Sequence, residues 1–237
     1  CSSDLLGPGH NVIEIAADMG KSAIAIAKQF GCHVTLLDLD IEQHFEHASG
    51  QTARDHGIDL SSVETMELDM SQIDQEVHFK HFDCAVFEAS LSHYPTKKKQ
   101  KVLQGIAKHT DEILLHELTL RGADITLGGD DCALARHVKQ DAGRTLSIAF
   151  HPLTVAKWKE LLEGVGYEVV QVETGPIVAL NPLTLVKDEG VNGFAKIVWN
   201  IVSDSDIRNR VLETKKMMKV HEDELGYVII QAQPKKV

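Results

Sequence analysis

The sequence is poor in aromatic residues and cysteine, and it has no long hydrophobic run. Aromatic side chains make up 5% of the 237 residues, which leaves no obvious platform on which a flat ring would stack. The four cysteines are widely spaced and form no CxxC pair, a pattern typical of a reducing compartment rather than of a disulfide scaffold. No apolar stretch approaches the roughly 18 residues that a membrane span needs. We therefore expect a cytoplasmic protein that does not enter a membrane.

Positive charge is also in short supply. The chain has 24 basic and 35 acidic residues, which gives a formal net charge of −11. Such a surface repels phosphate backbones and anionic lipid, so we expect neither nucleic acid nor a membrane surface as a partner. The one basic run, Lys97 to Lys99 with Lys101, is interpreted as the solvated start of a helix. A neutral or cationic small molecule is the substrate class that remains.

Metal-binding motifs are absent from the sequence, although it contains 13 histidines. Only His44 and His47 have the tight spacing with which a helix can present two ligands to zinc. They lie in a polar segment that we expect to face solvent, so we predict no metal site.

Short apolar runs alternate with amphipathic segments through most of the chain. The runs predict seven strands, and the segments between them predict helices in which apolar residues recur every three or four positions. Such alternation favours an α/β fold, a doubly wound, mostly parallel seven-stranded sheet with helices on both faces. The expected strands are 12–16, 32–37, 63–68, 82–87, 113–115, 167–172 and 227–231, and the expected helices are 21–30, 42–55, 96–108, 155–163 and 204–222.

We expect residues 1–237 to form a single domain, with residues 175–224 inserted before the last strand. The inserted block includes a helix whose apolar stripe consists of Ile207, Val211, Leu212 and Met218. An apolar patch of that size is normally covered. The block either caps the active site, with residues 181–190 bordering the pocket, or packs against a second subunit in a homodimer, or merely thickens the core.

Acidic residues follow three successive strands at the edge where an open parallel sheet binds its ligands. The turn after the first strand has small residues and ends at Gly20, and its Asp18 is of a type that tolerates a left-handed backbone. Asp38 ends the second strand, 18 positions past Gly20, where a carboxylate can accept both hydroxyls of an adenosine ribose. Asp69, after the third strand, is placed to accept from an adenine amino group, with Met70 along the base.

These residues, from Val12 to about Leu118, resemble the class I S-adenosylmethionine (SAM)-dependent methyltransferases. The fourth-strand sequence Phe82-Asp83 to Glu88-Ala89 belongs to the same resemblance, and later segments resemble a bacterial branch of the family with small-molecule substrates. The resemblance implies methyl transfer from SAM, with S-adenosylhomocysteine (SAH) as the product. It also implies a cofactor pocket lined by Glu14, Ala16, Asp18, Gly20, Asp38, Leu39, Asp69 and Met70, with Glu88 beside the methionine portion.

Two features depart from the family pattern. Ala16 and Asp18 stand where two glycines are usual, and Ala16 narrows the approach to the methionine portion by one methyl group. The segment 6–9 runs almost directly into the first strand, where relatives have a helix. Because the sequence also begins at Cys1 rather than at methionine, we expect a segment to be missing from its start.

Residues past the fourth and fifth strands lie where a methyl acceptor would be activated. His93 is the first candidate for a general base, because the ordinary pKa of histidine suits proton transfer near neutrality. His116 is the second, and Tyr94 and Glu117 qualify by position. Alternatively, both histidines have a purely structural role.

Two other function classes stay open. Asp38 would serve a nicotinamide cofactor equally well, although such an oxidoreductase needs closely spaced glycines to admit a pyrophosphate. The second open class is a partner protein that binds SAM without catalysing a reaction.

Overall fold

The computed structural model describes residues 6–16, 20–39, 60–75, 79–177 and 182–236. The chain divides into two compact units. The first comprises residues 1–117, 156–173 and 228–237, and the second comprises residues 118–155 and 174–227. The long strands β5, β7 and β8 contribute residues to both.

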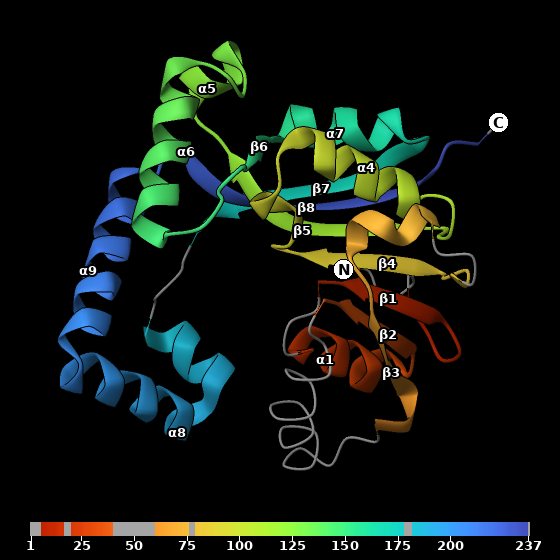
Figure 1. Ribbon diagram of the computed structural model, residues 1–237, viewed down its shortest axis with the longest axis horizontal. Helices are drawn as coiled ribbons and strands as arrows, with labels where there is room; N and C mark the ends of the chain where they lie inside the picture. Colours follow the sequence, from red (N-terminus) through yellow and green to blue (C-terminus); the bar gives the residue numbers. More distant parts are fainter. Residues whose placement is uncertain (1–5, 17–19, 40–59, 76–78, 178–181, 237) are drawn as a thin grey trace. The chain divides into compact units, whose positions relative to one another are not determined.

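One sheet runs through the structure, in the strand order β3-β2-β1-β4-β5-β8-β7, with the two-residue strand β6 paired to β5 (Figure 1). The strands are β1 (Asn11–Ile15), β2 (His33–Asp38), β3 (Val63–Glu67), β4 (Cys84–Glu88), β5 (Ile113–Leu120), β6 (Leu153–Thr154), β7 (Tyr167–Pro176) and β8 (Leu225–Pro234). The seven strands of the main path confirm the predicted architecture, and every strand predicted from the sequence is present with shifts of a few residues at its ends.

The strand order reverses at β1. This strand pairs in parallel with β2 on one side and with β4 on the other, so that Ile15 lies opposite both Leu37 and Phe87. The chain therefore leaves β1 and β4 in diverging directions at their carboxyl ends. In a doubly wound sheet this reversal is where a ligand site forms.

The last strand, β8, is antiparallel to β5. The backbone N–H of Arg121, after β5, donates to the carbonyl of Glu224, just before β8. At the opposite end, Gln231 of β8 donates from its side chain to the carboxyl group of Glu112, just before β5. The start of one strand thus lies beside the end of the other, and the sheet is mostly, not wholly, parallel.

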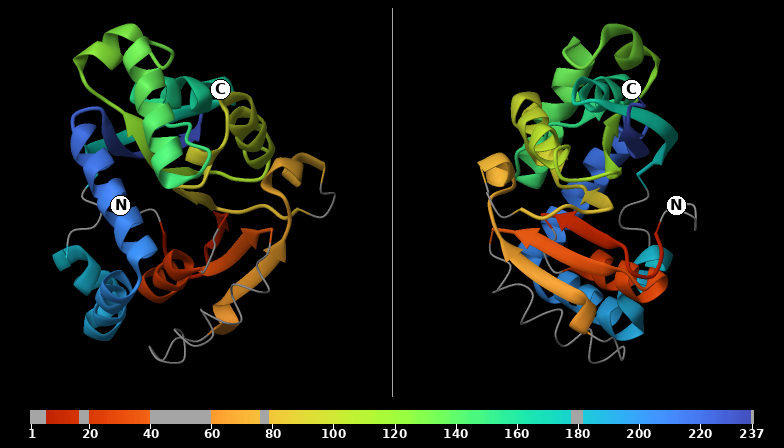
Figure 2. Two further views of the ribbon diagram at one scale, coloured as in Figure 1. Left: turned by 60° about the vertical axis from the view of Figure 1, so that its left-hand side comes forward. Right: turned by 90° about the vertical axis from the view of Figure 1, so that its right-hand side faces the viewer.

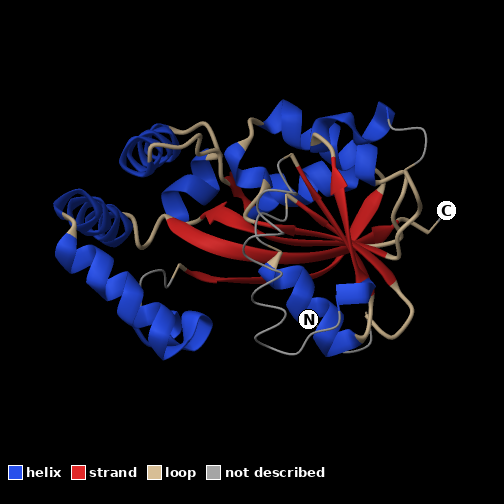
Figure 3. Cartoon of the chain, turned by 60° about the horizontal axis from the view of Figure 1, so that its bottom comes forward, coloured by secondary structure: helices blue, strands red, loops and turns tan. Residues whose placement is uncertain are grey.

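Helices of the first unit lie on both faces of the sheet (Figure 3). Helix α1 (Lys21–Phe30) covers one face, where Ala23 and Ala27 pack with alternate residues of the strands, such as Val12 and Val34. It ends at Gly31, which has φ 70° and donates its N–H to the carbonyl of Ala27. The first unit also contains α4 (Thr96–Ile106), α7 (Val155–Gly164, from its second residue) and the 3₁₀ helices η2 (Leu60–Ser62), η3 (Met70–Gln75) and η4 (Leu91–His93).

Helix α4 corrects one expectation. It begins at Thr96, as the lysine run indicated, but that run is not solvated throughout, because Lys99 is fully buried. The predicted helix 42–55, with His44 and His47, lies outside the described residues.

The second unit contains α5 (Ala123–Gly128), α6 (Ala133–Leu146), α8 (Pro182–Ser203, interrupted at Gly190) and α9 (Ser205–Val220). Helices α8 and α9 form a consecutive pair (Figure 2). The sequence predicted a helix over 204–222, and α9 lies within this range. Its N-cap is Asp204, whose carboxylate accepts from the backbone N–H groups of Asp206 and Ile207. The sequence did not predict α5, α6 or α8.

The apolar stripe predicted on α9 is only partly buried. Met217 packs against α6 in the core of this unit, and Met218 lies at the edge of that core. In contrast, Ile207 is 39% exposed and Leu212 is 58% exposed. The inward face of α9 therefore includes Met217, which the predicted stripe lacked, and leaves out Ile207 and Leu212.

Candidate functional site

The turn after β1 adopts a left-handed backbone where the sequence has no glycine. Ala16 has φ 56°, and its N–H donates to the carbonyl of Leu37 over 2.7 Å. Gly20 has φ 66° and begins α1, with its carbonyl accepting from Ile24. A left-handed conformation is costly for any residue with a Cβ atom, so Ala16 is under backbone strain. Asp18, also assigned to the cofactor, lies outside the described residues.

Ala16→Gly is expected to raise the free energy of unfolding by about 0.5–1 kcal/mol, because it relieves this strain at the cost of some chain entropy. Affinity for SAM should stay equal or improve, since a methyl group is removed from the turn. Ser147→Gly is the matched control, since Ser147 has the same φ of 56° at the end of α6. The control should gain stability in urea unfolding without any change in SAM affinity. Loss of binding by a folded Ala16→Gly variant would show that the turn has another role.

A cavity lies at the carboxyl ends of β1 and β2. Its enclosed part measures about 50 Å³, below the roughly 300 Å³ at which ligand pockets begin, so a nucleoside would place only one portion inside it. Five residues that the sequence assigned to the cofactor meet here, together with three that it did not. The cavity is lined by Ala16, Leu37, Asp38, Leu39, Leu68, Asp69, Met70 and Tyr94.

Backbone donors hold the two carboxylates of this cavity. Asp38 accepts from the N–H of Leu39 over 2.7 Å, and Asp69 accepts from the N–H of Ser71 over 2.8 Å. The bond to Ser71 holds the pKa of Asp69 below its ordinary value, so this group stays ionised at neutral pH. A carboxylate can accept several hydrogen bonds at once, so both side chains can also accept from hydroxyl or amino groups of a ligand.

Tyr94 is the lining residue whose place the sequence did not reveal. It was a candidate for chemistry beside the methyl group, yet it lines the same cavity as Asp38 and Asp69. Burial, followed by the charges of Asp69 and Asp38, raises the pKa of its hydroxyl. The Lys98 ammonium lies 4.0 Å from the centre of its ring. Only the fold brings this loop after β4 to the ends of β2 and β3.

A second group of polar residues gathers around the first turn of α1. Glu14 is 3% exposed, and its Oε2 atom is buried without a hydrogen-bond partner in the described chain. Burial and then the charge of Glu88 raise its pKa to about 7, against a smaller lowering by the N–H of Ala23 and the hydroxyl of Ser22. The Ser22 hydroxyl also donates to Glu88. These neighbouring carboxyl groups would accept a cation readily.

Of the two candidate bases, His116 belongs to this group, and His93 lies in the loop after β4. The Nδ1 atom of His116 lies 3.7 Å from a carboxyl oxygen of Glu88. This pairing raises the pKa of His116 and lowers that of Glu88. His93 is exposed at the end of η4, one residue before Tyr94.

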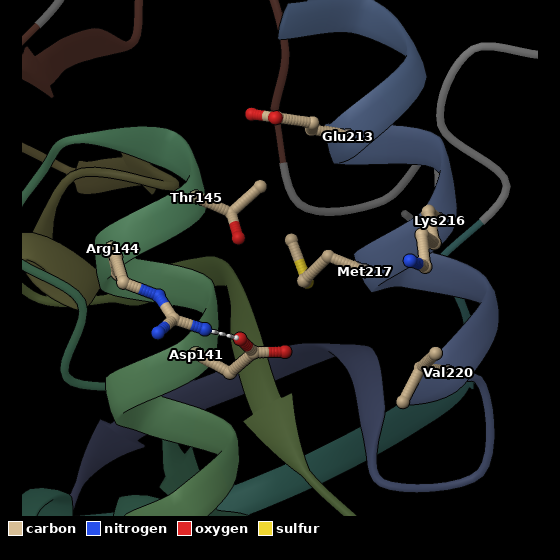
Figure 4. Close-up of a pocket in the computed structure, with 7 residues that line it drawn as sticks. All are labelled: Asp141, Arg144, Thr145, Glu213, Lys216, Met217 and Val220. Atoms are coloured by element: carbon tan, nitrogen blue, oxygen red, sulfur yellow. Dashed lines mark hydrogen bonds and ion pairs between the residues drawn. The ribbon is translucent and has the colours of Figure 1, made fainter.

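A second cavity, of about 420 Å³, lies between α6 and α9 within the second unit (Figure 4). Met217 forms its buried floor, and charged side chains surround it. Asp141 is already paired with Arg144 over 2.7 Å and with buried His221 over 3.0 Å. The pair with His221, which directly follows α9, links α6 to the end of α9, and we assign no ligand to this cavity.

Among the described residues, no three His, Cys, Asp or Glu side chains gather as a metal site would require. No helix in the described part of the chain is both long and apolar enough to span a membrane.

The strand order and the reversal at β1 define the class of fold. The chain has the Rossmann-like fold of the class I SAM-dependent methyltransferases. No family's sequence profile matches the chain. An uncharacterised protein of Haemophilus influenzae is 27% identical over 220 residues, which cover 90% of this chain and 78% of that protein.

Solved structures are similar over nearly the whole chain. A SAM-dependent methyltransferase from Thiobacillus denitrificans, in complex with SAH, has a TM-score of 0.63 and 14% identity, covering 97% of this chain and 87% of that one. The cyclopropane synthase MmaA2 from Mycobacterium tuberculosis has a TM-score of 0.67 and 13% identity, covering 96% and 79%. At these identities the likeness is one of fold, and the site residues carry the functional argument.

Proposed function

We propose that this protein is an enzyme that transfers a methyl group from SAM to a small-molecule acceptor. The observation that carries the proposal is the single cavity in which Asp38 and Asp69 face the same space as Ala16 and Tyr94. A carboxylate at the end of the second strand of such a sheet suits the hydroxyls of a ribose. One at the end of the next strand suits the amino group of an adenine. Solved SAM and SAH complexes among proteins of this fold support the same cofactor.

The polar group around α1 fits the other end of SAM. A ligand ammonium would supply the positive charge and the donor that the buried Oε2 of Glu14 lacks. Glu88 lies close enough to Glu14 to raise its pKa, so one cation would serve both. In this assignment Glu14, Ala16, Asp18, Gly20 and Glu88 hold the methionine portion, Asp38 and Leu39 hold the ribose, and Asp69 and Met70 hold the adenine.

The protein's own contribution to the chemistry is modest. When bound, SAM supplies an electrophilic methyl group on a positively charged sulfur. The protein has to align the acceptor with that group and exclude water, and it needs a base only if the acceptor carries a proton. His93 and His116 are the proposed bases. Because Glu88 raises the pKa of His116, the neutral form of this histidine, which can accept a proton, is populated at higher pH than in an ordinary histidine.

The two alternative functions predict different ligands. In a nicotinamide-dependent oxidoreductase, a pyrophosphate would have to approach the turn closely, and the Cβ atom of Ala16 opposes this. A non-catalytic partner protein would bind SAM and SAH without turning either over.

Calorimetric titration with SAM, SAH and NAD tests the assignment, followed by incubation of the protein and labelled SAM with a metabolite extract. We expect binding of SAM and SAH, no binding of NAD, and transfer of label to a small molecule. Binding of NAD alone would favour the oxidoreductase, and binding of SAM without transfer would favour the partner protein. The His93→Ala and His116→Ala variants then identify the base, because the relevant one loses transfer while keeping its SAH affinity.

We also propose that residues 175–224 form a cap over the active site or the interface of a homodimer. We propose a cytoplasmic location for the protein. Amide hydrogen exchange with and without SAH tests the cap. Protection confined to residues before 118 would contradict it, and sedimentation at several concentrations tests the dimer.

A further inference from the structure

The segment 90–94, between β4 and α4, is held at both ends by buried charges that the proposed chemistry does not use. Glu117, on β5, is 1% exposed, and Lys99, on α4, is fully buried. A buried charge is costly unless hydrogen bonds and opposite charges compensate it. The partners of these two groups therefore indicate what the charges stabilise.

Glu117 binds the start of the segment with both carboxyl oxygens. Its Oε1 accepts from the N–H of Leu91 over 2.8 Å and from the hydroxyl of Ser90 over 3.5 Å. Its Oε2 accepts from the N–H of Ser92 over 3.0 Å and from the hydroxyl of the same residue over 2.6 Å. Burial raises the pKa of Glu117, while these donors and the charge of Lys99 act to keep it ionised. Four donors on one carboxylate leave the backbone of the segment little freedom.

Lys99 binds the end of the segment. Its ammonium donates to the carbonyl of Tyr94 over 2.7 Å and lies 5.2 Å from the centre of the Trp158 ring. Trp158 is itself fully buried in α7. The carbonyl that Lys99 holds belongs to the residue whose side chain lines the cavity with Asp38 and Asp69.

The backbone entering the segment also needs support. Ala89 has φ 50°, a left-handed conformation that a residue with a Cβ atom keeps only when its surroundings enforce it. Its N–H donates to the carbonyl of His116, the residue before Glu117. The end of β5 thus fixes both the strained entry and the first turn of the segment.

We infer that Glu117 and Lys99 are positioning residues that hold the segment 90–94 from its two ends and so set where Tyr94 lies in the cofactor cavity. This inference rests on the proposed function, because it takes the cavity to be the cofactor site. It also removes Glu117 from the candidate bases, since both of its oxygens are engaged by the loop.

Amide hydrogen exchange without any ligand tests the hold on the segment. Glu117→Gln replaces one acceptor oxygen by an NH₂ group that faces donors, so exchange in peptides covering 89–95 should accelerate by about tenfold. Glu112→Gln is the matched control, the same substitution just before the other end of β5, and it should leave these peptides unchanged. Unchanged exchange in folded Glu117→Gln would overturn the inference. If that variant does not fold, Ser92→Ala removes the 2.6 Å bond while keeping the backbone donors of Glu117, and it should accelerate exchange by a smaller factor.

A double-mutant cycle on SAH affinity tests whether the effect passes through Tyr94. Glu117→Gln and Lys99→Gln should each weaken SAH binding by about tenfold, and neither should add more than about twofold in a Tyr94→Ala background. Lys99→Arg, which keeps the charge and a donor, should recover most of the affinity. Independent, additive losses would overturn the inference. Failure of the unaltered protein to bind SAH would instead overturn the proposed function, while the exchange experiment would still decide whether Glu117 holds the segment.

Discussion

Asp38→Ala is expected to weaken SAM binding by roughly 1.5–3 kcal/mol, a factor of about 10 to 150 in Kd, as for the loss of charge-assisted hydrogen bonds. Asp38 ends β2 and lines the cavity beside Asp69, where its carboxylate would accept from ribose hydroxyls. Folding should change little, because the side chain is only half-buried and Leu39, whose backbone N–H it accepts from, is exposed. Calorimetric titration with SAM and SAH measures the loss.

Asp83→Ala provides the matched control. The Asp83 carboxylate accepts from the N–H of Asn11 over 2.7 Å, at the end of the sheet opposite to the cavity. This variant should lose stability without losing affinity. Asp38→Asn keeps one acceptor oxygen and should fall between Asp38→Ala and the unaltered protein. Equal affinities of Asp38→Ala, Asp38→Asn and the unaltered protein would remove the main support of the cofactor assignment.

Glu14→Gln is expected to raise the free energy of unfolding at pH 8 while leaving it nearly unchanged near pH 4.5. Folding raises the pKa of Glu14 from 4.5 to about 7, which destabilises the ionised folded state by about 3 kcal/mol. Between these values the folded protein binds more protons than the unfolded chain. The contribution of Glu14 is therefore fully favourable below pH 4.5 and is lost as the pH rises to 7. Glutamine cannot ionise and escapes this loss.

Urea unfolding of both proteins at pH 4.5 and pH 8 measures the effect. Glu64→Gln is the opposite control, because Lys80 lowers the pKa of Glu64, so this variant should gain nothing at pH 8. SAM should also bind more tightly as the pH rises through 7, since its ammonium favours the ionised form of Glu14, and the variant should lose this dependence. A Glu14→Gln protein no more stable at pH 8 than the unaltered one would contradict the raised pKa.

Local signals in the sequence predicted the first half of the fold closely. Helix α1 has the predicted bounds, because its apolar face, its first residue after Gly20 and its end at Gly31 are all set by neighbouring residues. The second unit was predicted far less well. Residues 118–153 combine polar stretches with small residues, and α6 acquires its buried face by packing against distant parts of the chain, including Met217 of α9 and Leu225 of β8.

The same division holds within the site. Asp38 and Asp69 could be assigned from sequence because each follows a recognisable strand, and parallel strands bring their carboxyl ends to one edge. Tyr94 could not be placed, because its position depends on the turn after β4 and on the buried charges of Glu117 and Lys99. A run of lysines predicts a solvent-exposed segment in any sequence, and only the packing of α4 against its neighbours shows that Lys99 is buried.

The sequence by itself determined the class of fold, the order of strands and helices in the first unit, and the acidic residues at the strand ends. These follow from hydrophobic periodicity and turn residues, which act over a few neighbouring positions. Only the tertiary structure decided that Ala16 carries a left-handed backbone, that the charge of Glu88 acts on buried Glu14, and that Glu117 holds the loop of Tyr94. Each of these depends on burial and on charges brought together from distant parts of the chain, and no local pattern encodes them.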